Sequence, residues 1–169
     1  MSTRVAKSAE AQLEGFVAKF TPEMAGLVKA VLAKMRRRLP GAVEMVYDNY
    51  NALVIGFGPT ERPSEAPFSI AVYPRWINLF FLQGKKLRDP EKLLKGSGNQ
   101  VRSIVIESAG TLDDPAVDEL IEEAMERAAV PFDFAQKRKM LIRAIAPKQR
   151  PRRPAKPARA ADGKRQSLR

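Results

Sequence analysis

Short apolar segments with a period of two, separated by tight turns, occupy the middle of the chain and constrain its fold most strongly. Strands joined by such short connections pair with their neighbours in antiparallel fashion. The predicted strands are residues 44–48, 52–57, 68–73, 76–82 and 101–107. This block therefore predicts an antiparallel five-stranded meander.

Helices are predicted on both sides of the strand block. An apolar stripe at helical spacing predicts a helix over residues 9–20, and Thr21-Pro22 begins a second helix that runs to about residue 38. Asp114-Pro115 begins a third, which ends near residue 130. A one-sided antiparallel sheet has to cover its apolar face, and these helices are the available cover. The predicted class is α+β, a two-layer sandwich with helices packed on one face of the sheet.

The last part of the chain has a different composition. A further helix is one interpretation of residues 132–145, after which residues 147–169 contain nine basic residues and one acid, +8 of the net charge of +11. Pro-rich, strongly charged segments bury too little apolar surface to order themselves. We therefore expect an α+β domain over residues 1–146 and a disordered basic tail over residues 147–169.

The composition excludes several kinds of chemistry. The chain has no Cys and no His, which rules out disulfides, thiolate nucleophiles and the Ser-His-Asp triad. No apolar run approaches the roughly 20 residues of a membrane-spanning helix, and the N-terminus lacks the apolar stretch of a secretory signal. We expect a cytoplasmic, non-enzymatic binding protein with no cofactor and no metal ligands, and without a membrane partner.

One stretch carries a family resemblance. Residues 79–98 read LFFLQGKKLRDPEKLLKGSG, and Arg102 follows at the next strand. An apolar strand, Gly, Leu, Asp-Pro, Leu-Leu, Gly-x-Gly and then Arg resembles the signature of the YdhG-like family of uncharacterised bacterial domains. The resemblance implies a frataxin-like fold, with helices on one face of an antiparallel sheet. It also implies a role related to iron chaperones, with a partner in iron–sulfur assembly.

The same stretch offers a candidate ligand site. Lys85, Lys86 and Arg102 would form a cationic mouth for a small anionic ligand, and Tyr47 or Trp76 would supply an aromatic wall. The alternative is structural, and the residues alone favour it. In that interpretation the glycines permit turns, Asp89-Pro90 begins a short helix, and Arg102 pairs with a carboxylate.

The tail is a second candidate site. Its cations alternate with prolines, as in arms that lie along nucleic acid and contact phosphates without reading sequence. The candidate phosphate contacts are Lys148, Arg150, Arg152, Arg153, Lys156 and Arg159. The tail has no aromatic residue, so it offers no ring on which a base could stack. A solubilising tail is the equally weighted alternative.

The third predicted helix is strongly acidic. Asp118 with Glu122, and Glu119 with Glu123, have the i, i+4 spacing that would present carboxylates to a hard cation. The favoured interpretation is a solvated helix face, and a third is that the basic tail folds back onto it.

Overall fold

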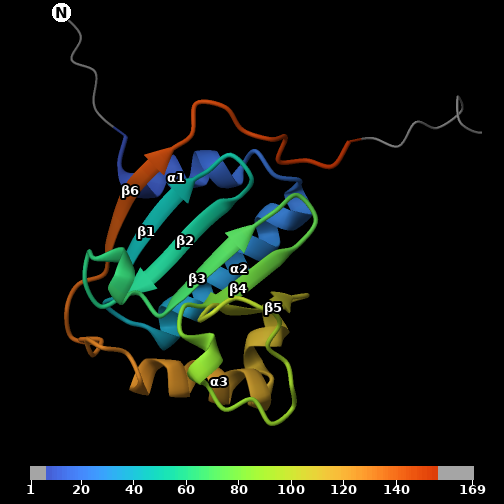
Figure 1. Ribbon diagram of the computed structural model, residues 1–169. Helices are drawn as coiled ribbons and strands as arrows, with labels where there is room; N and C mark the ends of the chain where they lie inside the picture. Colours follow the sequence, from blue (N-terminus) through green and yellow to red (C-terminus); the bar gives the residue numbers. More distant parts are fainter. Residues whose placement is uncertain (1–6, 156–169) are drawn as a thin grey trace, which may run out of the picture.

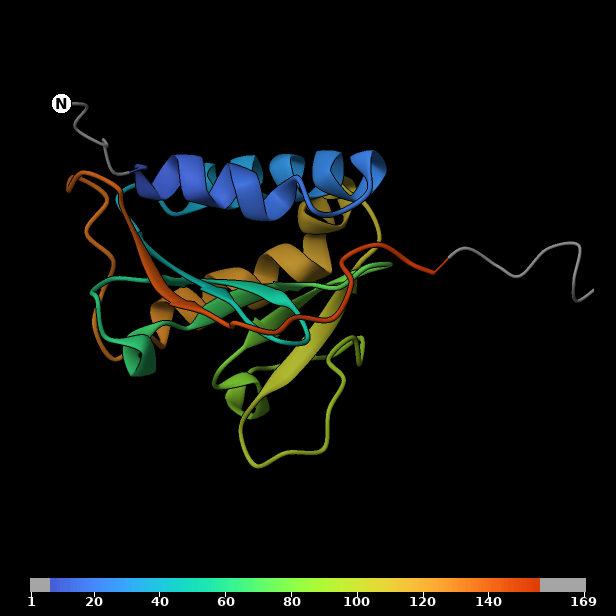
Figure 2. The same cartoon turned by 90° about the horizontal axis from the view of Figure 1, so that it is seen from above.

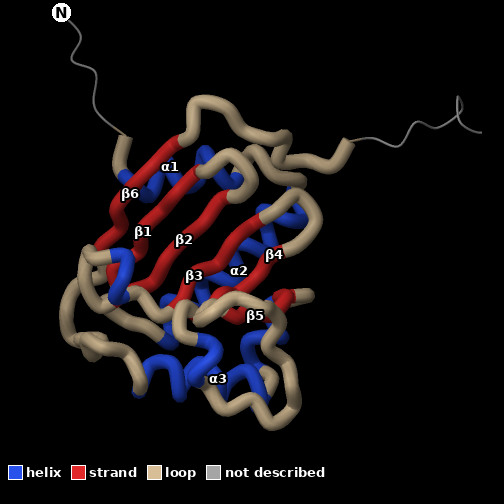
Figure 3. The backbone as a smooth tube through the Cα atoms, viewed as in Figure 1, coloured by secondary structure: helices blue, strands red, loops and turns tan. Residues whose placement is uncertain are grey.

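Six strands form one mixed sheet within residues 7–155, the part of the chain that the computed structural model describes (Figures 1 and 3). Their order across the sheet is β5-β4-β3-β2-β1-β6. The strands are β1 (Val43–Asp48), β2 (Leu53–Gly58), β3 (Phe68–Val72), β4 (Ile77–Phe81), β5 (Arg102–Ile106) and β6 (Lys139–Ile145). The first five form the predicted antiparallel meander, and β6 pairs with β1 in parallel.

The helices cover one face of this sheet. α1 (Ala9–Val17) and α2 (Pro22–Arg38) lie side by side over it (Figure 2). Thr21 caps α2 as predicted, because its hydroxyl accepts a hydrogen bond from the Met24 amide at 3.2 Å. α3 (Pro115–Glu126) contributes its buried residues to the same core. The α+β class with a helix layer on the sheet is confirmed, and none of the helices in residues 7–155 is long and apolar enough to cross a bilayer.

Strand alternation decides which side chains form the core. On β2 the side chains buried beneath the helices are Leu53, Ile55 and Phe57, and every second residue of β3 and β4 is buried there too. A smaller apolar cluster of Val43, Met45 and Ala66 lies on the other side of the sheet.

The prediction of a helix over residues 132–145, and of only five strands, was wrong. Residues 139–145 form β6, whose register places Leu141 opposite Met45 and Ile142 opposite Val46. The apolar residues of this segment are spaced ambiguously between the helical and strand periods. The segment forms a strand because pairing with the free edge of β1 satisfies the backbone hydrogen-bonding groups of both strands.

Two buried carboxylates lie on the helix-facing side of β1. Glu44 accepts two hydrogen bonds from Arg36, both of 2.8 Å, and Asp48 accepts from Lys19 at 2.7 Å and Arg152 at 2.9 Å. Glu44 and Asp48 are both 0% exposed. Each charge is therefore neutralised by partners from other elements, as burial requires.

Arg152 corrects the prediction that the whole tail from residue 147 is disordered. Its side chain is buried, donating to Asp48 and to the carbonyls of Asn49 and Tyr50. The Arg150 amide also donates to the Tyr50 carbonyl, at 2.9 Å. Residues 146–155, which we call the arm, are thus ordered against the turn after β1. Residues 156–169 of the predicted tail lie outside the described residues.

Replacing Arg152 with Leu should strongly destabilise the protein, because it leaves Asp48 short of a partner and the Asn49 carbonyl without a donor. We expect the free energy of unfolding to fall by about 3 kcal/mol, which lowers the melting temperature by roughly 6–12 °C in a chain of this size. The matched control is Arg153→Leu, at an exposed neighbour, which should change stability by no more than about 0.5 kcal/mol. Equal, small losses in the two variants would show that the arm is not anchored by Arg152.

The ion pairs of Asp48 also predict a pH dependence. Burial by itself raises the pKa of this carboxyl, but hydrogen bonds from Lys19 and Arg152 outweigh burial and leave the pKa below its ordinary 3.8. A lowered folded-state pKa contributes stability above the ordinary value and loses it as the pH falls through the folded-state value. Urea unfolding should therefore show stability falling below about pH 4. Asp48→Asn should show a smaller fall over the same range, and an unchanged slope would contradict this role of Asp48.

Candidate functional site

The loop between β4 and β5 is tied down at both ends rather than built around a helix. A single 3₁₀ turn, η2 (Gly84–Lys86), follows β4, and Lys95 pairs with Ser103 beside β5. The predicted short helix at Asp89-Pro90 is absent. The Asp89 carboxylate instead accepts hydrogen bonds from the amides of Leu93 and Leu94, at 2.9 and 2.8 Å, and closes a turn. Positive φ angles at Lys92 and Gly96 prevent a helix there.

Arg102 holds this loop from inside. One guanidinium nitrogen donates to the carbonyls of Gly98, at 2.7 Å, and Val101, at 2.8 Å. No carboxylate within residues 7–155 pairs with it, so its charge is satisfied by backbone oxygens. Arg102 therefore contacts the backbone of its own loop, and the carboxylate partner that the structural interpretation expected is not found within residues 7–155.

The structure does not bring all the predicted ligand-binding residues together. Lys85 and Lys86 lie on η2, beyond the end of β4, whereas Trp76 precedes the start of that strand. Tyr47 lies on β1, three strands away in the sheet order. Strand alternation could not show this, because it gives the face of a residue and not its position along the sheet.

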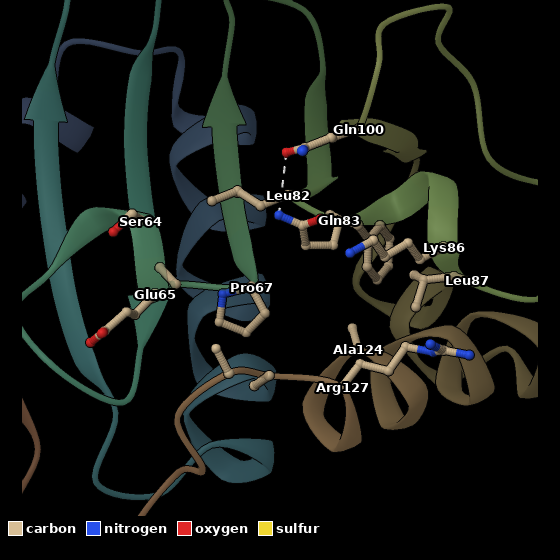
Figure 4. A pocket seen from close by; sticks show the side chains of 14 residues that line it. Ser64, Glu65, Pro67, Leu82, Gln83, Lys86, Leu87, Gln100, Ala124 and Arg127 are labelled. Atoms are coloured by element: carbon tan, nitrogen blue, oxygen red, sulfur yellow. Dashed lines mark hydrogen bonds between the residues drawn. The ribbon is translucent and has the colours of Figure 1, made fainter.

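A cleft of about 290 Å³ lies where η2, the ends of β3 and β4, and α3 meet (Figure 4). Its apolar walls and its polar rim come from segments far apart in the sequence. Apolar lining residues include Ala66, Pro67, Phe81, Leu82, Leu87, Ala124 and Ala128; the polar ones are Ser64, Glu65, Gln83, Lys86, Gln100 and Arg127. Among the predicted site residues only Lys86 lines it. Gln83, Gln100 and Arg127 were missed, because no local pattern joins a turn to a helix some 40 residues later.

Lys86 is the charge that the cleft presents. In Figure 4 its amine points toward the middle of the ring of lining side chains, and within the described chain it has no hydrogen-bond or ion-pair partner. The Arg127 guanidinium points away and donates to Glu123 at 2.6 Å. The Glu65 carboxylate also points away and accepts from the Thr60 hydroxyl.

Glu123 stays ionised beneath this rim. Burial raises the pKa of its carboxyl, but hydrogen bonds from the Arg88 amide and the Arg127 side chain outweigh burial and lower it. Glu123 and Arg127 therefore neutralise each other, and Lys86 remains as the unpaired cation.

The predicted nucleic-acid contacts of the tail divide into three groups. Lys148, Arg150 and Arg153 are exposed, Arg152 is buried, and Lys156 and Arg159 lie outside the described residues. The arm lies against β1 and the turn after α1 rather than against the acidic helix α3. On α3, Asp118 pairs with Arg38. No three His, Cys, Asp or Glu side chains within residues 7–155 are grouped so that they could hold a metal ion.

Comparison of the chain with protein-family models, with curated proteins and with solved structures finds no match in any of the three. Interpretation of the site therefore depends on its geometry and chemistry.

The close approach of η2 and β5 predicts a contrast between two glycines of the loop. A Cβ on Gly84 would lie 2.5 Å from the Arg102 Cβ and 2.9 Å from its amide nitrogen, whereas a Cβ on Gly98 would meet nothing within 4 Å. Gly84→Ala should therefore cost about 1–3 kcal/mol of unfolding free energy, and Gly98→Ala less than about 0.5 kcal/mol. Thermal unfolding of the two variants measures this, and equal effects would contradict the packing described for the loop.

Proposed function

We propose that this protein is a non-enzymatic binding domain whose cleft between η2 and α3 takes a small ligand with an apolar body and one anionic group. The observation that carries the proposal is Lys86, an unpaired ammonium directed into a cleft with apolar walls and a polar rim. Apolar walls with a few convergent polar groups are typical of small-ligand sites. In this proposal the anionic ligand lies at one end of the β4–β5 loop and not at Arg102.

The polar groups beside Lys86 support an oxyanion such as a carboxylate. The Gln83 amide donates to the Gln100 side chain across the cleft, at 3.3 Å, and both amides have further hydrogen-bonding capacity. A carboxylate could accept from the Lys86 ammonium and from an amide at once, and charge-assisted hydrogen bonds are the stronger kind. The walls would bury a short hydrocarbon chain.

Membership of the YdhG-like family remains a prediction, supported by the motif and by a helix layer over an antiparallel meander. The cytoplasmic location and the partner in iron–sulfur assembly also remain predictions. The geometry of residues 7–155 supports the ligand cleft more directly than a metal-carrier role, because Lys86 and the side-chain amides of Gln83 and Gln100 can donate to an anion there.

An NMR titration with octanoate tests the proposal. Amide resonances of Gln83, Lys86 and Ala128 should shift with added octanoate, and octylamine, which has a like-sized chain but a positive charge, should bind more weakly. Lys86→Gln should weaken octanoate binding about tenfold, the effect of losing one charge-assisted hydrogen bond of roughly 1.5 kcal/mol.

Lys85→Gln is the matched control, because Lys85 is exposed on the same turn, as Lys86 is, but does not line the cleft. It should leave the affinity unchanged. If octanoate shifts no resonance at the cleft, or if both substitutions weaken binding equally, the proposed site is wrong.

A further inference from the structure

Three segments meet at the other end of β3 and β4, away from the cleft. The turns after β1 and after β3 lie side by side, because Leu53 at the start of β2 pairs with Val72 at the end of β3. The arm crosses the same end of the sheet, as both views show (Figures 1 and 2). Together they form an open groove of about 690 Å³.

An exposed, prepositioned aromatic ring lies in this groove. Trp76 is 43% exposed, and its ring stacks on that of Tyr73 with 4.8 Å between centroids and 20° between planes. Because one face of the Trp76 ring rests on Tyr73, the ring is held in a fixed orientation at the turn after β3. A large ring held at the surface in this way is available for stacking by a ligand.

The groove is lined by Arg75 from the turn after β3 and by Arg150 and Arg153 from the arm, which we call the groove arginines. All three are exposed, and none forms an ion pair with a residue of 7–155. The Arg153 guanidinium donates to the Lys19 carbonyl at 3.2 Å, and the Arg150 guanidinium lies over the Tyr50 ring. No acidic side chain lines the groove. Its net charge is therefore positive, which selects an anionic partner.

Arg152 explains how the arm keeps this geometry. It lies between Arg150 and Arg153 in sequence, yet it is buried in its ion pair with Asp48. Arg152 therefore holds the arm in place, and Arg150 and Arg153 remain on the surface. Ala155 lines the groove at the end of the arm, and the sequence continues from there with further cations.

We infer that this groove binds single-stranded nucleic acid, in which a base stacks on Trp76 and the groove arginines contact phosphates. Aromatic rings beside a cationic track are the usual means of binding single strands, because every base has a face that stacks and every nucleotide has a phosphate. In a duplex the bases are already stacked on one another and cannot reach the Trp76 ring. A fixed ring among cations thus favours the single strand over the duplex.

Trp76 is the only Trp in the chain, so its fluorescence reports this contact directly. A short oligo(dT) strand should quench it and bind more tightly than the matching dA–dT duplex. Thymidine monophosphate should quench only at far higher concentration, because one nucleotide cannot occupy all the groove arginines.

Affinity for labelled oligo(dT), measured by fluorescence anisotropy, separates stacking from charge. Trp76→Leu should weaken binding about fivefold or more and leave the salt dependence unchanged. Trp76→Phe should restore part of the loss. Arg150→Gln and Arg153→Gln should each make the slope of log affinity against log salt shallower by about 0.7. Lys85→Gln, at the opposite end of β4, is the matched loss of one charge and should change neither quantity.

Several results would overturn the inference. Equal binding of duplex and single strand, unaffected by Trp76→Leu, would mean binding of phosphates alone. Quenching by thymidine monophosphate at the same concentration as the strand would mean a free-nucleotide site. Competition by poly-glutamate as effective as that by oligo(dT) would mean an acidic protein partner. Absence of oligo(dT) binding at low salt would exclude nucleic acid altogether. None of these results depends on whether octanoate binds at Lys86.

Discussion

Burial of Asp48 and Glu44 on one face of β1 is the constraint on which the rest of the structure depends. Neither carboxylate reaches solvent, so each needs cations from other elements. Asp48 takes Lys19 from the turn after α1 and Arg152 from the arm, while Glu44 takes Arg36 from α2 and Arg138 from the segment before β6. A charge left without its partner in this interior would cost several kcal/mol, about a third or more of a typical domain's stability. These pairs therefore specify where both helices, β6 and the arm dock.

The two candidate sites lie at opposite ends of β3 and β4 and differ in chemistry. At one end Pro67 and Phe81 open into the cleft, which is half enclosed, mostly apolar and faced by one cation. At the other end Tyr73 and Trp76 open into the groove, which is shallow, aromatic and lined by three arginines. The first suits a small molecule and the second a flexible polyanion. The sheet separates them, so substitutions at one site should leave the other unaffected.

Local patterns were sufficient for most elements. The caps at Thr21-Pro22 and Asp114-Pro115 and the alternation of Leu53, Ile55 and Phe57 predicted two helices and the meander, because capping and strand period depend on neighbouring residues. The same reasoning failed for residues 139–145, where the partner of the strand is β1, nearly a hundred residues earlier. Of the predicted ligand-binding residues, Lys86 lines the cleft. Tyr47 and Trp76 do not, and only the sheet order reveals their distance from Lys86.

The sequence by itself determined the residue types that are available: no thiol, no imidazole, a helix–meander–helix order and a strongly basic C-terminal segment. The tertiary structure alone decided which of those cations are buried and which are exposed. Arg150, Arg152 and Arg153 look alike in the sequence, yet Arg152 is buried against Asp48 and its two neighbours line an aromatic groove. The physical reason is that a charge is buried only where an opposite charge and hydrogen-bond acceptors are already in place. The acceptors of Arg152 lie on a strand about a hundred residues away, brought near only by folding.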